Sequence, residues 1–124
     1  YLEEEASRER EEEIKEYEVL LSSYGVTFED LVKCSPRHRD TRQSLLQAAR
    51  ELANRNQLLS ELKAKRKLPL MDLEKVTGLS RKTLERGRKY IIAMALLINK
   101  REEYLYLSSY LILPSPAEKG VPKK

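Results

Sequence analysis

Several residue types are scarce in this 124-residue chain, and each absence excludes a class of protein. The single cysteine, Cys34, cannot form an internal disulfide, and no Cys/His cluster has the spacing of a zinc site. No apolar run approaches the roughly 18 residues that a membrane-spanning helix needs, and the sequence contains no secretory signal. Four glycines and five prolines are few for a turn-rich β-protein, so the composition favours long helices.

Patterns that carry catalysis or bind cofactors are missing as well. The sequence has no glycine-rich phosphate loop and no nucleophile paired with a base. His38 is the only histidine, so a metal or catalytic site built on it lacks partners. We expect Cys34 to be a small core residue rather than a nucleophile. We therefore expect no enzymatic activity, no metal, no cofactor and no small-molecule substrate.

Charged residues are plentiful and unevenly distributed. The net charge of the chain is +4. Residues 1–18 contain nine acidic and three basic residues, whereas residues 63–89 contain ten basic and three acidic ones. A basic cluster confined to one segment is typical of a surface that binds a polyanion, although a solvated helix surface can have the same composition. Charge alone therefore leaves both interpretations open.

The pattern of apolar residues predicts one helical domain with polar ends. Residues 1–16 are charged almost all round a helix, so we expect a linker or an exposed helix. Alternatively, this acidic arm competes with DNA for the basic segment. Residues 17–113 are predicted to form an all-α, compact multi-helix bundle, and residues 114–124 a disordered tail. Because the chain begins with Tyr1 rather than Met, we expect it to be a fragment of a longer protein.

Local signals predict where helices of the bundle begin and end. Thr27 and Asp30 have the spacing of a capping box. Asp40 is expected to be the N-cap of a later helix, with a break at residues 54–56. Residues 104–112 are predicted to form a closing helix, although their alternation also permits a strand.

Residues 69–98 have the form of a helix-turn-helix. Pro69 suits the first turn of a short helix, and Gly78 allows a sharp turn because glycine tolerates positive φ. Leu79 is expected to fill the space between the two helices, and Ser80 is a good N-cap for the second, longer helix. The second helix of this motif can lie in the major groove of DNA.

On a helical wheel, the second helix has a core side and an outward side. Six residues fall on the core side: Leu84, Gly87, Ile91, Met94, Ala95 and Ile98. Gly87 costs about 1 kcal/mol relative to Ala in a helix interior, and we expect close approach of the first helix to compensate. Four charged residues fall on the outward side: Lys82, Glu85, Arg86 and Lys89.

The outward side predicts specific DNA contacts. Lys82 and Arg86 are the candidates for reading base edges, since Arg can bind guanine with two hydrogen bonds worth about 1–3 kcal/mol of discrimination. Glu85 can accept from cytosine. The remaining candidates are expected to contact phosphates, which positions the protein without specifying sequence. They are Arg81, Thr83 and Lys89 on the second helix, and Lys65, Arg66 and Lys67 just before the first.

The sequence also resembles a known family. KRKLPLMDLEK (65–75) and TGLSRKTLERGRKYIIAM (77–94) resemble the C-terminal domain of the sigma-I group of bacterial RNA polymerase sigma factors. CSPRHRDTRQ (34–43) resembles the same group's S-P-x-H-x-D-x-R-Q segment. The resemblance covers residues 17–110. It implies an all-helical domain that binds promoter DNA at the −35 region.

Partners and site residues follow from the resemblance. It implies RNA polymerase core as a partner of the full-length protein, and the N-terminal cytoplasmic domain of a membrane-anchored anti-sigma factor as a partner of this domain. The location implied is cytoplasmic, with the anti-sigma partner able to hold the protein at the membrane. Base reading carries over to Arg81, Lys82, Thr83 and Arg86, which agrees with the wheel for Lys82 and Arg86 but less well for Thr83.

Two alternatives remain open from the sequence. Arg37, His38 and Arg39 are candidates for a second DNA contact, or they belong to a loop that merely leads into a helix. The whole chain is either a promoter-binding domain or a helical protein-interaction module whose main ligand is a regulatory protein.

Overall fold

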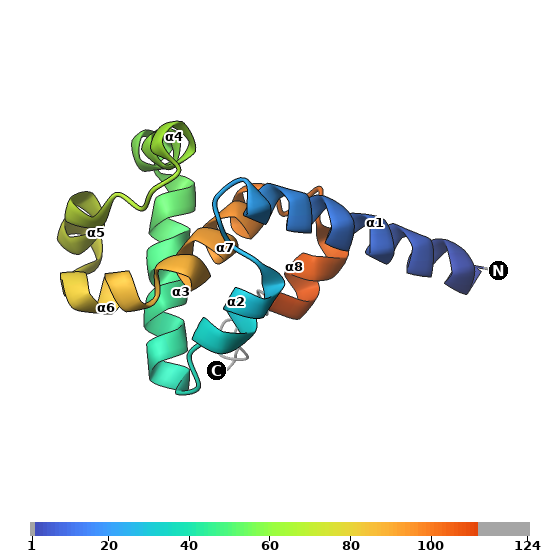
Figure 1. The fold of residues 1–124 in the computed structure, drawn as a ribbon, viewed down its shortest axis with the longest axis horizontal. Coiled ribbons are helices and arrows are strands. Elements are labelled where there is room, and N and C mark those ends of the chain that lie inside the picture. Colours follow the sequence, from blue (N-terminus) through green and yellow to red (C-terminus); the bar gives the residue numbers. More distant parts are fainter. Residues whose placement is uncertain (1, 112–124) are drawn as a thin grey trace, which may run out of the picture.

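The computed structural model describes residues 2–111, which form α-helices and contain no strand in that range (Figure 1). The helices are α1 (Leu2–Ser22), α2 (Phe28–Cys34), α3 (Arg39–Asn54), α4 (Asn56–Lys65), α5 (Leu70–Thr77), α6 (Arg81–Arg86), α7 (Arg88–Asn99) and α8 (Leu105–Leu111). The predicted all-α class is confirmed, and the alternative strand near residue 105 is wrong. The predicted tail at 114–124 lies outside the described residues.

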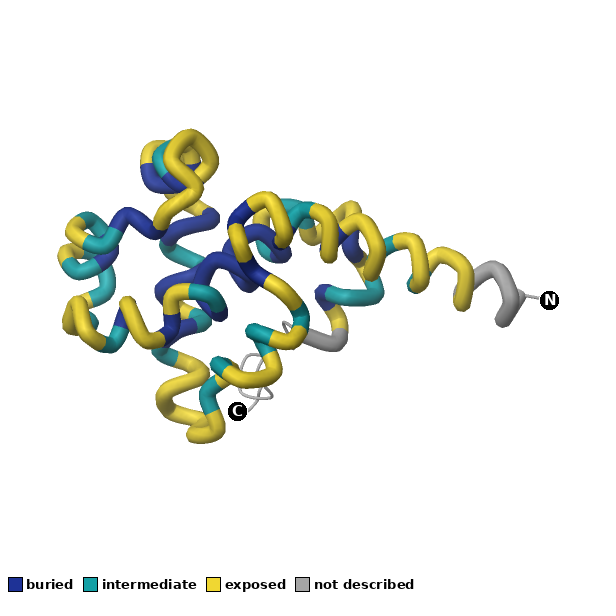
Figure 2. Tube along the Cα trace, in the orientation of Figure 1, coloured by how far each residue is buried: buried dark blue, intermediate teal, exposed yellow. Residues whose placement is uncertain are grey.

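The core is organised around α7. Its residues from Tyr90 to Leu97 are all buried, so this helix is enclosed rather than amphipathic. The long helix α3 crosses it, and Ala48 and Ala49, both buried, allow the two backbones to approach closely. Figure 2 shows the buried segments converging where these helices meet. The remaining helices pack around this crossing.

Helix α1 is mostly exposed over residues 7–16, and its last turns lie in the core. Tyr17 is fully buried, and its hydroxyl donates to the carbonyl oxygen of Ala93 at 2.7 Å. The N-terminal half projects away from the bundle on the side opposite α5 and α6 (Figure 1). The alternative of an acidic arm lying over the basic segment is therefore not the arrangement in the structure. The expected boundary between residues 16 and 17 falls inside this one helix.

Part of the acidic segment nevertheless contacts the bundle. The Glu13 carboxylate accepts from the backbone N–H groups of Tyr106 at 3.0 Å and Leu107 at 3.1 Å, at the start of α8. Arg10 lies over the Tyr106 ring, 5.6 Å from its centroid. These contacts connect α1 to α8, two helices at opposite ends of the described chain.

The predicted helix boundaries are partly confirmed. The Thr27 and Asp30 capping box is present in full, with both hydrogen bonds made. The break at Arg55, between α3 and α4, is also present. The prediction of Asp40 as an N-cap is wrong: α3 begins at Arg39, so His38 occupies the cap position two residues earlier, and its side chain makes no capping bond. Asp40 instead lies in the first turn, where its negative charge interacts favourably with the helix dipole.

No helix among residues 2–111 combines the length and the apolar character required to cross a bilayer.

Candidate nucleic-acid interface

The turn between α5 and α6 has the geometry of a helix-turn-helix. Gly78 ends α5 with φ of +78°, a conformation that favours glycine. Ser80 is the N-cap of α6, and its hydroxyl oxygen accepts from the backbone N–H of Thr83 at 3.2 Å. Leu79, between them, is half-buried and packs against the core. The predicted turn is confirmed residue by residue.

Pro69 stands at the N-cap position of α5 rather than in its first turn, because α5 begins at Leu70.

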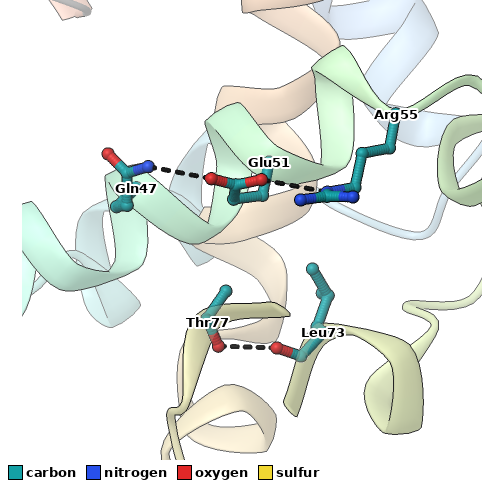
Figure 3. Close-up of polar contacts among 5 residues, drawn as sticks. All are labelled: Gln47, Glu51, Arg55, Leu73 and Thr77. Carbon is teal, nitrogen blue, oxygen red and sulfur yellow. Dashed lines mark hydrogen bonds and ion pairs between the residues drawn. The ribbon is translucent and has the colours of Figure 1, made fainter. Parts of the chain in front are cut away.

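Thr77 contributes to this turn in a way that the sequence did not reveal. Its hydroxyl donates to the Leu73 carbonyl oxygen at 2.6 Å and accepts from the Leu79 backbone N–H at 3.1 Å. Figure 3 shows the Thr77–Leu73 bond close to Glu51 on α3, whose carboxylate binds Arg55 at 3.0 Å. A threonine before a turn glycine was the available signal, since its hydroxyl can bond to local backbone groups.

The helix following the turn is not continuous, which corrects the prediction of a single long second helix. It divides at Gly87 into α6 and α7, and the ribbon bends there (Figure 1). A Cβ atom at Gly87 would lie 2.5 Å from Leu45 Cδ1 on α3. The expected reason for the glycine was close approach of the first helix of the motif, and this was wrong. The approaching helix is α3, which lies earlier in the chain than the motif.

The bend leaves a cationic surface at α6 and the start of α7. Lys82, Arg86 and Arg88 are exposed, and among the described residues none of these side chains has a hydrogen-bond or ion-pair partner. Arg81 instead pairs with Glu85, Nε to Oε2 at 3.4 Å, on the outside of the helix. Lys82 and Arg86 are thus accessible where the wheel placed them.

Thr83 and Lys89 are less accessible than their neighbours. Thr83 is half-buried, and its hydroxyl lies 2.9 Å from that of Ser80. Lys89 is also half-buried, and its Nζ lies 3.2 Å from Asp30 Oδ2 on α2. The backbone N–H of Thr27 and the Lys89 ammonium hold the pKa of Asp30 below its usual value. The roles of Thr83 and Lys89 in DNA contact remain predictions. Each side chain would first have to break its hydrogen bond or ion pair within the fold.

The basic residues just before α5 also include both paired and unpaired side chains. Arg66 has a left-handed backbone, φ +58°, and ends α4. Its guanidinium donates to the Ser23 carbonyl oxygen at 3.1 Å and lies over the Tyr24 ring at 4.7 Å. Lys65 pairs with Glu61 at 3.7 Å, while Lys67 is exposed without a partner among the described residues.

The loop between α2 and α3 is exposed except at Pro36, which is half-buried. Arg37, His38 and Arg39 are all exposed, and this connection lies at the lower end of α3 (Figure 2). The guanidinium of Arg42 donates to the Pro36 carbonyl oxygen at 3.1 Å and so holds the loop against the first turn of α3. Exposure is compatible with the predicted second DNA contact, which remains a prediction.

Comparison with known proteins gives the chain a family. No family model matches it. It is 42% identical to the RNA polymerase sigma factor SigI of Bacillus subtilis over 103 residues, covering 83% of this chain and 40% of the relative. It is 40% identical over 111 residues to SigI of Bacillus anthracis, covering 90% and 45%, and 40% identical over 92 residues to SigI6 of Acetivibrio thermocellus, covering 74% and 36%.

The chain thus spans less than half the length of the curated relatives it matches. Together with the all-helical fold, these similarities show that the chain belongs to the SigI-type RNA polymerase sigma factors, of which it corresponds to a C-terminal domain.

Proposed function

We propose that this chain binds promoter DNA at the −35 region by placing α6 in the major groove. The observation that carries the proposal is the pair Lys82 and Arg86, one turn apart on α6, exposed and without partners among the described residues. Ser80 caps the helix and Gly78 sets its angle to α5, so these two side chains project from a fixed support. Bidentate contact from Arg to guanine is the commonest specific contact of this kind.

The relatives extend the proposal to transcription. They are named RNA polymerase sigma factors, and we infer that the protein containing this chain also acts with RNA polymerase core. Such a factor directs an enzyme without being one, so no residue of this chain is assigned a catalytic role. Base reading is assigned to Lys82 and Arg86, with Glu85 restrained by its pairing to Arg81.

We propose further that an anti-sigma factor regulates this domain by binding it through a cytoplasmic segment. The support is the resemblance to the sigma-I group. If that partner covers α6, then partner and DNA must weaken each other's binding to the same degree, because linkage between two ligands is reciprocal. A titration of the chain with labelled DNA and increasing partner tests this. Simultaneous binding without mutual weakening would overturn occlusion, and an affinity for the partner with none for DNA would favour the protein-interaction module.

Selection from a random DNA pool tests base reading directly. The wild-type chain and Arg86→Ala are each used to select bound duplexes from the same pool. We expect the wild type to enrich one short sequence and Arg86→Ala to lose preference at one base pair of it, because the bidentate contact is gone. Enrichment of the same sequence to the same degree by both proteins would remove Arg86 from base reading, and no enrichment by the wild type would contradict the proposed function.

A further inference from the structure

A surface groove lies beside α6, between α2 and the start of α7. Its volume is about 280 Å³. Six of its lining residues are charged, and they come from segments far apart in the sequence: Asp30, Lys33, Glu85, Arg86, Arg88 and Lys89. The four cations against two acids give it a positive charge. The groove adjoins the proposed base-reading surface, because Arg86 belongs to both.

The two acids of the groove each have an ion-pair partner. Asp30 binds the Thr27 N–H at 3.1 Å and Lys89 at 3.2 Å, and Glu85 binds Arg81, which is outside the groove lining, at 3.4 Å. Neither carboxylate is therefore paired with Lys33, Arg86 or Arg88.

Lys33, Arg86 and Arg88 are all exposed, and none has a hydrogen-bond or ion-pair partner among the described side chains. Three unpaired cations from three helices, α2, α6 and α7, thus line one concavity. Such an arrangement attracts an anion, since bringing like charges together is unfavourable unless a counter-charge is bound.

We propose that this groove binds a phosphate of the DNA backbone next to the bases read by α6, with Lys33 and Arg88 as the two cations that hold it. The proposal rests on the proposed function, and it extends the interface from the helix-turn-helix to α2. An open surface groove continuous with α6 suits a chain-like polyanion that already passes over Arg86. Arg suits one side because its guanidinium binds phosphate oxygens bidentately, and Lys the other as a point charge.

Asp30 has a second role in this arrangement: it is a positioning residue that withholds Lys89 from the phosphate. Its carboxylate holds Lys89 against α2 and adds one negative charge to the groove wall. Replacing Asp30 by Asn removes that charge and releases Lys89. The proposal therefore predicts a gain of DNA affinity from Asp30→Asn, which a purely structural role for the ion pair does not.

The test measures binding of the chain to two labelled duplexes as a function of salt. One duplex is taken from the selection described above and the other is a shuffled duplex of the same composition. The variants are Lys33→Ala, Arg88→Ala and Asp30→Asn. Lys15→Ala on α1 and Arg101→Ala beyond the far end of α7 are matched controls, since both residues are exposed and lie outside the groove. Circular dichroism melting establishes that each variant is folded.

We expect Lys33→Ala and Arg88→Ala each to weaken binding to both duplexes by the same factor, roughly threefold to fivefold, and to reduce the slope of log affinity against log salt by about 0.9. Asp30→Asn strengthens binding to both duplexes and steepens the slope. The controls leave affinity and slope unchanged. The preference for the selected duplex stays the same in all variants, because a phosphate contact carries no sequence information.

Three results would overturn the proposal, and they are distinguishable. If Lys33→Ala and Arg88→Ala bind as the controls do while the wild type still prefers the selected duplex, the groove does not bind phosphate and base reading by α6 stands. If the wild type binds neither duplex, the proposed function itself fails and this inference with it. A weakening confined to the selected duplex would assign these residues to base reading instead.

Discussion

Two basic segments of this chain look alike in sequence and differ in structure. Residues 63–67 contain four cations, and residues 81–89 contain five. In the first segment, Arg66 is bound within the fold and Lys65 is paired to Glu61. In the second, Arg81 and Lys89 are paired, but Lys82, Arg86 and Arg88, on adjoining helices, have no partner among the described residues. The density of positive charge therefore does not show which cations are free to bind a ligand, whereas the intramolecular partners of each cation do.

The difference has a backbone cause. The first segment ends α4 with Arg66 in a left-handed conformation, which turns its side chain toward Ser23 and Tyr24 at the end of α1. The second segment lies on α6 and at the start of α7, whose position against α3 is fixed by Gly87. On α6 the helical geometry directs the exposed cations outward. At the end of α4, by contrast, Arg66 connects the turn to the end of α1.

The largest effect is expected where the second segment contacts the core. Gly87→Ala should destabilise the domain by about 1–3 kcal/mol, because the added methyl group would lie 2.5 Å from Leu45 Cδ1 and the buried Leu45 side chain would have to shift. The measurement is the free energy of unfolding in urea.

A double-mutant cycle separates this steric effect from a loss of backbone freedom. Leu45→Ala alone should cost about 2–5 kcal/mol through the cavity it leaves. In that background, adding Gly87→Ala should cost much less than it does in the wild type, since its methyl group then enters the vacated space. Strict additivity of the two changes would show that α3 does not determine the break between α6 and α7.

The next effect concerns DNA rather than stability. Lys82→Ala or Arg86→Ala should each lose about 1–3 kcal/mol of discrimination between the selected duplex and a shuffled one. Neither should change the melting temperature, because both side chains are exposed and without partners among the described residues. Competition binding with the two duplexes measures the discrimination.

Lys67→Ala is the matched control from the first segment. Lys67 is equally exposed and also lacks a partner among the described residues. Any loss of affinity on its removal should be the same for both duplexes, as expected of a backbone contact. If Lys67→Ala lost as much discrimination as Arg86→Ala, both segments would read bases, and the predicted difference between them would be wrong.

Arg66 provides the reverse case, with a smaller effect. Arg66→Ala should lower the free energy of unfolding by about 1–2.5 kcal/mol, the sum expected of an exposed cation–π contact and a net hydrogen bond. Its DNA discrimination should be unchanged.

Arg66→Lys decides between the structural and the predicted phosphate role. Lysine keeps the charge but lacks the planar group that stacks on Tyr24. A structural arginine predicts that this variant is nearly as unstable as Arg66→Ala. Full stability in Arg66→Lys, combined with weaker DNA binding in Arg66→Ala, would return Arg66 to the interface.

How far the sequence predicts this structure depends on the distance between the residues involved. The Thr27 capping box, the Gly78 turn and the Ser80 cap were predicted correctly because both partners lie within four residues of each other. The exposure of Lys82 and Arg86 was also predicted correctly, because helical periodicity is local, whereas their role in reading bases stays a prediction.

The errors and omissions have the opposite character. Leu45 against Gly87 and Asp30 against Lys89 join segments far apart in the sequence, and no periodic pattern encodes such contacts. The Asp40 error was of two residues, within the usual uncertainty of a helix end. What sequence reasoning could not supply was the set of intramolecular partners, and this set decides which cations are free to bind a ligand.

The smallest effects distinguish the ion pairs of the two segments. Asp30 binds Lys89 between helices, whereas Glu61 binds Lys65 within one helix turn. Glu61→Gln should change stability by only about 0.3–0.5 kcal/mol, as is usual for such a surface pair. Asp30→Asn should lower the melting temperature at neutral pH by more, since it breaks a connection between α2 and α7.

The pH dependence of the melting temperature shows whether the charge on Asp30 causes this stabilisation. Its pKa in the folded chain is lowered by the Thr27 N–H and the Lys89 ammonium. The stability it contributes is therefore present above the unfolded-state pKa of about 3.9, and it is lost as the pH falls through the lower folded value. The difference in melting temperature between wild type and Asp30→Asn should close over that acid range. A difference that persists there, or one no larger than that of Glu61→Gln at neutral pH, would show that charge on Asp30 does not hold the second segment to α2. In that case the Asp30–Lys89 pair would not be what positions the unpaired cations of residues 81–89, and the comparison with residues 63–67 would lose this structural basis.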